Sequence, residues 1–188
     1  MITFRESDHT YWNGKIYVPS VSEILNLAYP FKAVISPEDL ELARLFGNAV
    51  HKASQYADMD VLDPKSVDKA ITPWLDDWSK FRADTGAQVM ETEKLVYSNT
   101  YRVAGTLDRL LLIGGKIVLV DIKTGTKNSK RNLVQIAGYE ILASEEMGIK
   151  IDRRIIVQLT GNGYKIHEPK KRENEEEIFR GLARQYWY

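Results

Sequence analysis

Hydrophobic residues form two long runs in the middle of the chain, residues 103–113 and 116–123, and the dipeptide Gly114-Gly115 separates them. A two-residue loop of glycines suits the positive φ angles that a tight hairpin turn requires. We therefore predict a central antiparallel β-hairpin over residues 103–123.

Shorter patterns predict the other strands. Asn13-Gly14 between apolar residues is a strong turn signal, so an N-terminal hairpin is expected within residues 3–18. Apolar and polar side chains alternate along residues 87–97, which predicts a strand just before the central hairpin. A glycine-containing turn separates the last two predicted strands, residues 151–160 and 164–167.

Capping signals and helical spacing of apolar residues predict the helices. Ser20 and Glu23 have the spacing of a capping box, so a short helix should begin there. Asp63-Pro64 should open another helical segment, which Pro73 interrupts before a fresh turn continues. Longer helices are predicted over residues 36–58, 129–147 and 173–187.

The predicted helix 36–58 has one apolar face, which should contact the core. Gly47 and His51 lie on the opposite face, so His51 is not a core histidine by position. A lone histidine on such a face is more often simply exposed to solvent. The apolar face consists of Leu42, Leu45, Phe46, Ala49, Ala53 and Tyr56.

Composition indicates one globular domain, because the 188 residues are 44% hydrophobic and 28% charged and no linker divides them. The expected parts are a hairpin with helices (1–86), a sheet core (87–168) and a C-terminal helix (173–188). The chain has no cysteine, which excludes disulfides and makes a cytoplasmic setting the simplest assumption. No secretory or membrane-spanning pattern is present.

The charge balance adds one restriction on partners. The 26 basic and 26 acidic residues cancel, whereas a protein that coats DNA nonspecifically is usually more basic. A locally basic channel is still compatible with this balance.

Three charged residues occur where the hairpin otherwise favours burial: Asp108 in its first strand, Asp121 and Lys123 near the end of its second. Side chains alternate along a strand, so Asp121 and Lys123 point the same way and Ile122 points the opposite way. Strand pairing can bring Asp108 beside them. Such a group suits Mg²⁺ or Mn²⁺ and a phosphate, although an isolated Asp-x-Lys is more often a surface ion pair.

The pattern Gly105-x-x-Asp108, twelve further residues and then Asp121-x-Lys123 resembles the PD-(D/E)xK nuclease superfamily, in its RecB-like exonuclease branch. Leu107 stands where that motif has proline, and Asp121 takes its acidic position. The predicted order of helix, three strands, helix and strand matches the αβββαβ core of that superfamily. The resemblance therefore implies an α/β (α+β), restriction-endonuclease-like fold in which helices flank a mixed central sheet.

The resemblance also implies roles outside the hairpin. Gly47-x-x-x-His51 matches a pattern in which the histidine binds metal, which reverses the solvent-exposed interpretation. Glu93 lies where such nucleases carry a glutamate, and a strand-edge charge that discourages aggregation is an equal alternative. Gln135 and Tyr139 match a pair that would hold the substrate or Lys123, with an exposed polar pair as the alternative.

A basic stretch follows the proposed site, because residues 122–135 contain four basic side chains and no acid. Its position favours contact with the DNA backbone over a merely solvated loop. Ser20 is foremost a helix cap, although the resemblance also implies a phosphate contact there. The further candidate DNA contacts are Thr124, Lys127, Lys130 and Arg131.

Together these positions imply a metal-dependent DNase. The resemblance assigns His51, Asp108, Asp121 and the Ile122 carbonyl as ligands of one or two Mg²⁺ or Mn²⁺ ions. Lys123 would orient or deprotonate the attacking water.

The implied function is an exonuclease of recombination or repair, encoded by a bacterium or phage. It would act on single-stranded DNA or duplex ends, with an annealing protein or helicase as a candidate partner. Alternatives are a structure-specific or single-strand endonuclease and a catalytically silent nucleic-acid-binding module.

Overall fold

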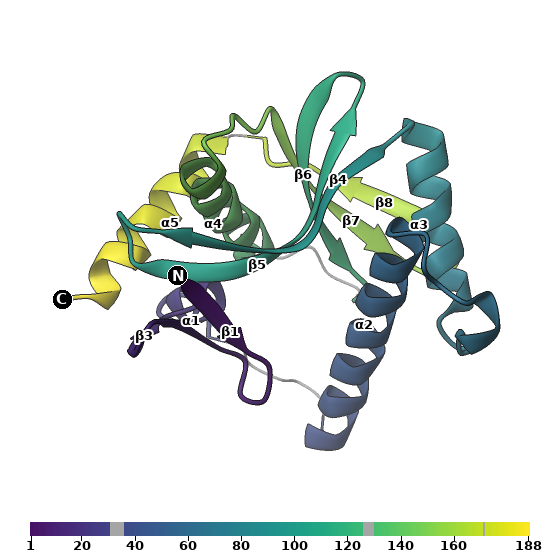
Figure 1. The fold of residues 1–188 in the computed structure, drawn as a ribbon, viewed down its shortest axis with the longest axis horizontal. Helices are drawn as coiled ribbons and strands as arrows, with labels where there is room; N and C mark the ends of the chain where they lie inside the picture. Colours follow the sequence, from purple (N-terminus) through teal and green to yellow (C-terminus); the bar gives the residue numbers. More distant parts are fainter. Residues whose placement is uncertain (31–35, 126–129, 171) are drawn as a thin grey trace.

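A computed structural model describes residues 1–30, 36–125, 130–170 and 172–188 of the protein. The chain folds into two β-sheets and several helices, shown in Figure 1. In chain order the elements are β1 (Ile2–Arg5), β2 (Thr10–Asn13), β3 (Ile16–Val18), α1 (Val21–Asn26), α2 (Pro37–Asp58), the 3₁₀ turn η1 (Pro64–Ser66), α3 (Thr72–Thr85), β4 (Gln88–Ser98), β5 (Val103–Ile113), β6 (Lys116–Lys123), α4 (Lys130–Met147), β7 (Arg153–Leu159), β8 (Tyr164–His167) and α5 (Arg172–Tyr186).

The larger sheet has the strand order β4-β5-β6-β7-β8. All neighbours are antiparallel except β6 and β7, which are parallel and are separated in sequence by α4. Gly114 and Gly115 adopt φ angles of 56° and 76° at the β5–β6 turn, as predicted. This mixed sheet flanked by helices confirms the predicted fold class.

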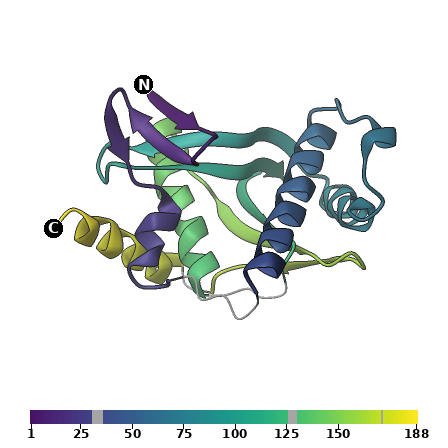
Figure 2. The same cartoon turned by 90° about the horizontal axis from the view of Figure 1, so that it is seen from below.

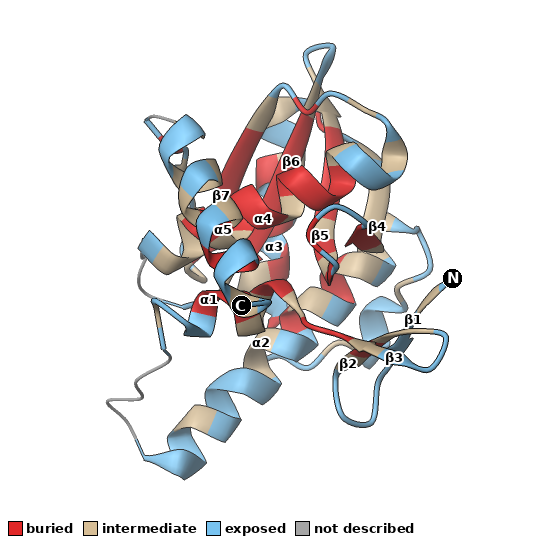
Figure 3. Cartoon of the chain, turned by 90° about the vertical axis from the view of Figure 1, so that its left-hand side faces the viewer, coloured by how far each residue is buried: buried red, intermediate tan, exposed pale blue. Residues whose placement is uncertain are grey.

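The two faces of this sheet carry separate hydrophobic cores. One core packs α1, α4 and α5 against the strands, with Leu142 and Phe179 fully buried. The other packs α2 and α3 against the opposite face through Val50, Trp78 and Phe81. Figures 1 and 2 show these two helical layers on either side of the sheet. Burial on both faces explains why β5 and β6 are almost continuously apolar (Figure 3).

The N-terminal strands β1, β2 and β3 form a small separate sheet. Tyr11 and Val18 pack it against Tyr97 of β4 and Ala104 of β5. The predicted capping box is present at α1, because the Ser20 side chain accepts a hydrogen bond from the backbone of Glu23, whose own side chain accepts one from Ser20. The predicted hairpin therefore exists, with β1 as an additional strand.

The predicted apolar face of α2 is largely wrong. Leu42, Leu45 and Tyr56 are 65%, 50% and 39% exposed, whereas Val50 and Ser54 are fully buried. The N-terminal part of α2 extends past the sheet (Figure 3), and Leu42 and Leu45 lie there, whereas Phe46 further along the helix contacts Trp74 of α3. The helix instead contacts the sheet through a face rotated toward residues 47, 50, 51 and 54, which are part-buried or buried.

The segment before β4 also differs from its prediction. Asp63-Pro64 opens only the single turn η1, and Pro73 lies in the first turn of α3 instead of interrupting a longer helix. Proline fits a first helical turn because the amide hydrogen it lacks would have no partner there. Gly86 ends α3 in the left-handed conformation, which glycine adopts without steric cost.

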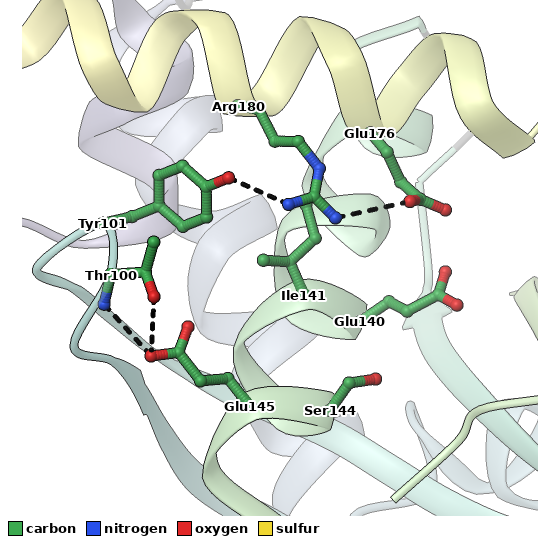
Figure 4. A pocket seen from close by; sticks show the side chains of 8 residues that line it. All are labelled: Thr100, Tyr101, Glu140, Ile141, Ser144, Glu145, Glu176 and Arg180. Carbon is green, nitrogen blue, oxygen red and sulfur yellow. Dashed lines mark hydrogen bonds and ion pairs between the residues drawn. The ribbon is translucent and has the colours of Figure 1, made fainter. Parts of the chain in front are cut away.

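A cavity of about 390 Å³ is lined by residues of α4, α5 and the β4–β5 turn (Figure 4). Glu145 of α4 accepts hydrogen bonds from the backbone and hydroxyl of Thr100 at 3.0 and 3.2 Å. Arg180 of α5 donates to the Tyr101 hydroxyl at 2.8 Å and pairs with Glu176. Glu145 and Arg180 therefore attach α4 and α5 to the turn.

Candidate active site

Strands β5 and β6 separate at the proposed site. Their backbone pairing begins at the glycine turn and ends at the pair Arg109 and Val120. Beyond that pair, the Asp108 Oδ2 atom accepts a hydrogen bond from the Ile122 backbone nitrogen at 2.7 Å. A carboxylate thus takes the place of a backbone carbonyl in the ladder, which fixes Asp108 where the strands diverge.

Three potential metal ligands converge at this point. One ligand atom each from His51, Glu93 and Asp108 lies within 4.8 Å of the other two. The His51 Nδ1 atom is 3.6 Å from Asp108 Oδ1 and 3.9 Å from Glu93 Oε1. The α2 helix, β4 and β5 therefore each contribute one side chain to the same point. His51 faces this group and is not exposed on the far side of α2.

The second nitrogen of His51 has a partner of its own. His51 Nε2 lies 3.1 Å from the Ile122 carbonyl oxygen, which can accept its hydrogen. That tautomer leaves the lone pair of Nδ1 directed toward the carboxylates. Burial disfavours protonation of His51, but the charges of Asp108 and Glu93 outweigh it and raise the pKa of the ring. A cation between these groups would replace the proton.

The buried Asp121 and the partly buried Lys123 form an ion pair next to the three ligands. The Lys123 Nζ atom is 3.0 Å from Asp121 and 3.4 Å from the Gln135 Oε1 atom. Asp121 is only 2% exposed, and its Oδ2 atom accepts no hydrogen bond from the described residues, although it lies 3.0 Å from the Lys123 Nζ atom in an ion pair. Burial raises the pKa of Asp121 to about 6, while Lys123 acts in the opposite direction.

Lys123 is charged despite its partial burial. Loss of solvent lowers its pKa, but attraction to Asp121 and Asp108 outweighs this and raises the pKa overall. The ammonium group therefore carries its proton, held between Asp121 and α4.

Helix α4 supplies the support behind this lysine. Gln135 accepts from Lys123 and donates from Nε2 to the Tyr139 hydroxyl at 3.3 Å. Tyr139 packs over Gly105 so closely that a β-carbon there would lie 2.7 Å from its ring. Tyr139 can occupy this position only because residue 105 of the Gly-x-x-Asp motif has no side chain. Burial raises the pKa of the Tyr139 hydroxyl well above its usual value.

Arg109 is a site residue that the sequence analysis did not identify. Its side chain is fully buried and donates to Glu93 at 2.9 Å, to Asp58 at 2.5 Å and to the Ser54 hydroxyl at 2.9 Å. It also reaches the backbone carbonyl of His51 at 3.4 Å. A charged residue beside Asp108 in an otherwise apolar strand was the available signal, because burying a charge is costly without dedicated partners.

Glu93 reaches the ligand group because β4 is irregular. The pairing with β5 shifts register between Val89 and Glu91, and Glu93 has a φ angle of 45°. Simple alternation along the predicted strand does not reveal this conformation. Strained backbone of this kind is often found at functional sites.

The remaining predicted DNA contacts lie in different surroundings. Thr124 is part-buried, and its hydroxyl would lie 3.5 Å from a β-carbon at Gly47 of α2. Lys130 is exposed at the start of α4. Arg131 donates to the Tyr29 and Ser22 carbonyls, so it connects α4 to α1. Lys127 lies outside the described residues.

These residues fit a divalent cation. Imidazole nitrogen and carboxylate oxygens are common ligands of Mn²⁺, and carboxylates also suit Mg²⁺. The raised pKa of Asp121 indicates that Lys123, whose Nζ atom lies 3.0 Å from both carboxylate oxygens, does not fully compensate the burial of this acid. His51, Glu93, Asp108 and Asp121 would hold the ion.

The mixed sheet and its acid, acid and lysine site define a class of proteins, the metal-dependent nucleases of restriction-endonuclease type. A family model described as the PD-(D/E)XK nuclease superfamily matches residues 63–186, more than half of the chain, so this protein belongs to that superfamily. Membership implies a hydrolase that acts on nucleic acid with divalent metal ions. The matched range contains Asp108, Asp121 and Lys123 but begins after His51.

Other comparisons add little to this assignment. A solved structure described as "Crystal structure of SSO0001" has a TM-score of 0.35 and 16% identity, and the match covers 88% of this chain and 84% of that one. No curated protein matches the chain. Among the described residues, no helix combines the length and apolarity needed to cross a membrane.

Proposed function

We propose that this protein is a Mg²⁺- or Mn²⁺-dependent DNA exonuclease of RecB-like type, acting in recombination or repair. The observation that carries the proposal is the convergence of His51, Glu93 and Asp108 beside the ion pair of Asp121 and Lys123. Such a cluster in an apolar sheet is costly unless a cation and a phosphate use it.

Each side chain has a specific task in this proposal. His51, Asp108 and Asp121 hold one or two ions, and Glu93 joins them from β4. When bound, such an ion would lower the pKa of a water molecule and neutralise charge on the phosphate. Lys123 is steered by Asp121 and Gln135 and orients the attacking water. The Ile122 carbonyl oxygen lies 3.1 Å from His51 Nε2, and its second lone pair would be available to the ion.

The proposal predicts the effect of two substitutions. Asp121→Asn and Lys123→Ala should each lower Mn²⁺-dependent cleavage of linear DNA by roughly 10²- to 10⁴-fold, because each removes a group that acts at the reacting phosphate. Cleavage of a labelled oligonucleotide measures this. Lys116→Ala is the control, because this exposed lysine lies at the other end of β6. Near-normal cleavage by either site variant would remove the assignment.

Circular and linear single-stranded DNA separate an exonuclease from an endonuclease. We expect the protein to degrade the linear strand with Mg²⁺ or Mn²⁺ and to spare the circle, and end labels at 5′ and 3′ then give the polarity. Cleavage of the circle would instead support the endonuclease alternative. Absence of cleavage together with absence of Mn²⁺ binding in calorimetry would support a catalytically silent nucleic-acid-binding module.

A further inference from the structure

A groove of about 690 Å³ leads into the candidate active site. Its inner end is formed by His51 and Glu93, two of the three converging ligands. Its outer end is formed by the β1–β2 hairpin, through Phe4 and His9. None of these outer residues has a role in the function proposed above.

The floor of the groove follows two paired strands. Leu95 of β4 and Thr106 of β5 are direct partners and line it. Glu93 and Asp108 lie two residues further along the same strands, so the floor continues to the ligand group. One wall is the α2 helix, where Asn48, Lys52 and Gln55 are spaced so that they share a face.

The opposite wall presents an aromatic surface. Phe4 pairs with Tyr11 across β1 and β2, so both rings lie on the side of the small sheet that faces β4 and β5. Tyr11 is buried there, and its hydroxyl is 3.0 Å from the Thr106 hydroxyl. Phe4 lies beyond that contact and remains 39% exposed. The hairpin thus projects past its own core and exposes the Phe4 ring in the groove.

His9 extends this surface. Its ring centroid is 5.7 Å from that of Phe4. The residue has a φ angle of 53°, an uncommon conformation for a residue other than glycine. The β1–β2 turn therefore holds its imidazole beside the Phe4 ring at a cost in backbone energy.

We propose that this groove binds unpaired nucleotides of the substrate, with a base stacked on Phe4 and His9 and the phosphates along α2. The phosphates are assigned to the α2 wall because Lys52 on that wall would attract them. Glu6 on the hairpin wall would repel them. Stacking on an aromatic ring requires a free base face, which a base inside a duplex does not have. The substrate class is therefore single-stranded nucleic acid or a duplex end with an unpaired strand. This inference rests on the proposed nuclease function.

The test measures binding apart from cleavage. Fluorescence anisotropy of a labelled linear single strand, in EDTA to prevent hydrolysis, should show that Phe4→Ala weakens binding roughly 5- to 150-fold, the range for loss of one stacked base. Phe4→Trp should retain binding, which shows that the position requires an aromatic ring. Ile16→Ala is the matched control, because this 70% exposed side chain lies on the same small sheet outside the groove.

A strand with abasic positions isolates the stacking. The unaltered protein should bind it more weakly than the intact strand, whereas this difference should be several-fold smaller for Phe4→Ala, which keeps only the His9 ring. Equal binding of the intact strand by Phe4→Ala and the unaltered protein overturns the groove assignment. If the unaltered protein still cleaves DNA with Mn²⁺ in that case, only the groove assignment fails. If it neither binds nor cleaves DNA, the proposed function fails as well.

Discussion

At the residue scale, Asp121 is a buried acid whose charge is only partly compensated. It is almost fully buried, one of its oxygens accepts no hydrogen bond from the described residues, and its pKa rises to about 6 because it has lost its solvent. Lys123 offsets only part of that cost. A raised pKa is expected for a buried carboxylate that binds a metal ion, because the cation supplies positive charge that the protein alone does not.

The raised pKa of Asp121 predicts how stability depends on pH without metal. A carboxyl with a raised pKa binds its proton more tightly in the folded state, so its contribution to stability falls as the pH rises from about 4 through 6. Asp121→Asn removes this charge. Its unfolding free energy relative to the unaltered protein should therefore increase by up to about 3 kcal/mol between pH 4 and pH 7.

Urea unfolding in EDTA across this pH range measures the difference. Asp68→Asn, at an exposed acid, provides the control and should show no comparable trend. A constant difference between Asp121→Asn and the unaltered protein would show that Asp121 ionises with an ordinary pKa.

At the element scale, the site depends on how closely β5 approaches α4. Gly105 leaves the space that Tyr139 occupies, and Tyr139 in turn contacts Gln135, which holds Lys123. The motif glycine therefore acts on the lysine through two residues, Tyr139 and Gln135. Its effect comes from volume, because the φ angle of Gly105 is not in the left-handed region.

Gly105→Ala should destabilise the protein by about 1–3 kcal/mol, as overpacking usually does, and should also lower cleavage because Tyr139 must shift. Gly181→Ala is the matched control, because no neighbouring atom lies within 4 Å of a β-carbon there and alanine favours the α5 helix. Urea unfolding and oligonucleotide cleavage test both variants. Equal stability of the two variants would contradict this packing argument.

A second connection between elements is the buried Arg109, which joins β5 to the end of α2 and to β4. Asp58 accepts hydrogen bonds from Arg109, Arg82 and the Trp78 indole, and Glu93 accepts from Arg109. Removing one partner of such a group leaves a buried charge without full compensation, which costs more than the pair itself contributes.

Arg109→Met should therefore destabilise the protein by about 3 kcal/mol or more, and the double variant with Asp58→Asn should recover part of the loss. Arg44→Met on the exposed surface of α2 should cost less than about 0.5 kcal/mol. Denaturant unfolding of these variants provides the measurement. A loss for Arg109→Met no larger than for Arg44→Met would show that the network contributes little.

At the scale of the whole molecule, the candidate ligands come from elements that different cores support. His51 lies on α2, which packs on one face of the sheet, while Asp121 and Lys123 contact α4 on the other. Glu93 and Asp108 lie on the strands between these layers. An ion bound by these groups would connect both layers, so metal binding should stabilise the whole fold.

Mn²⁺ at about 100 times its dissociation constant should raise the unfolding free energy by roughly 2.7 kcal/mol, and EDTA should reverse the effect. Asp108→Asn should abolish most of this gain, whereas Asp76→Asn, at an exposed acid of α3, should retain it. Thermal unfolding with and without Mn²⁺ provides the comparison. Equal stabilisation of the two variants would place the ion elsewhere.

Local signals determined much of the fold. The Gly114-Gly115 turn, the capping box at Ser20 and the apolar runs of β5 and β6 depend only on neighbouring residues, and all appear as predicted. The spacing of Asp108, Asp121 and Lys123 likewise follows from strand pairing. The buried face of α2 was not predictable, because it depends on where the sheet ends along the helix.

The sequence by itself determined most of the elements and the acid, acid and lysine motif, because periodicity and turn chemistry act over a few residues. The mixed sheet was implied by the resemblance to the nuclease superfamily. Only the tertiary structure decided that His51 faces Asp108, that Glu93 joins them and that Arg109 holds Glu93. These contacts link residues far apart in the chain. They exist because α2 packs across the sheet where β5 and β6 diverge, an arrangement that no local pattern encodes.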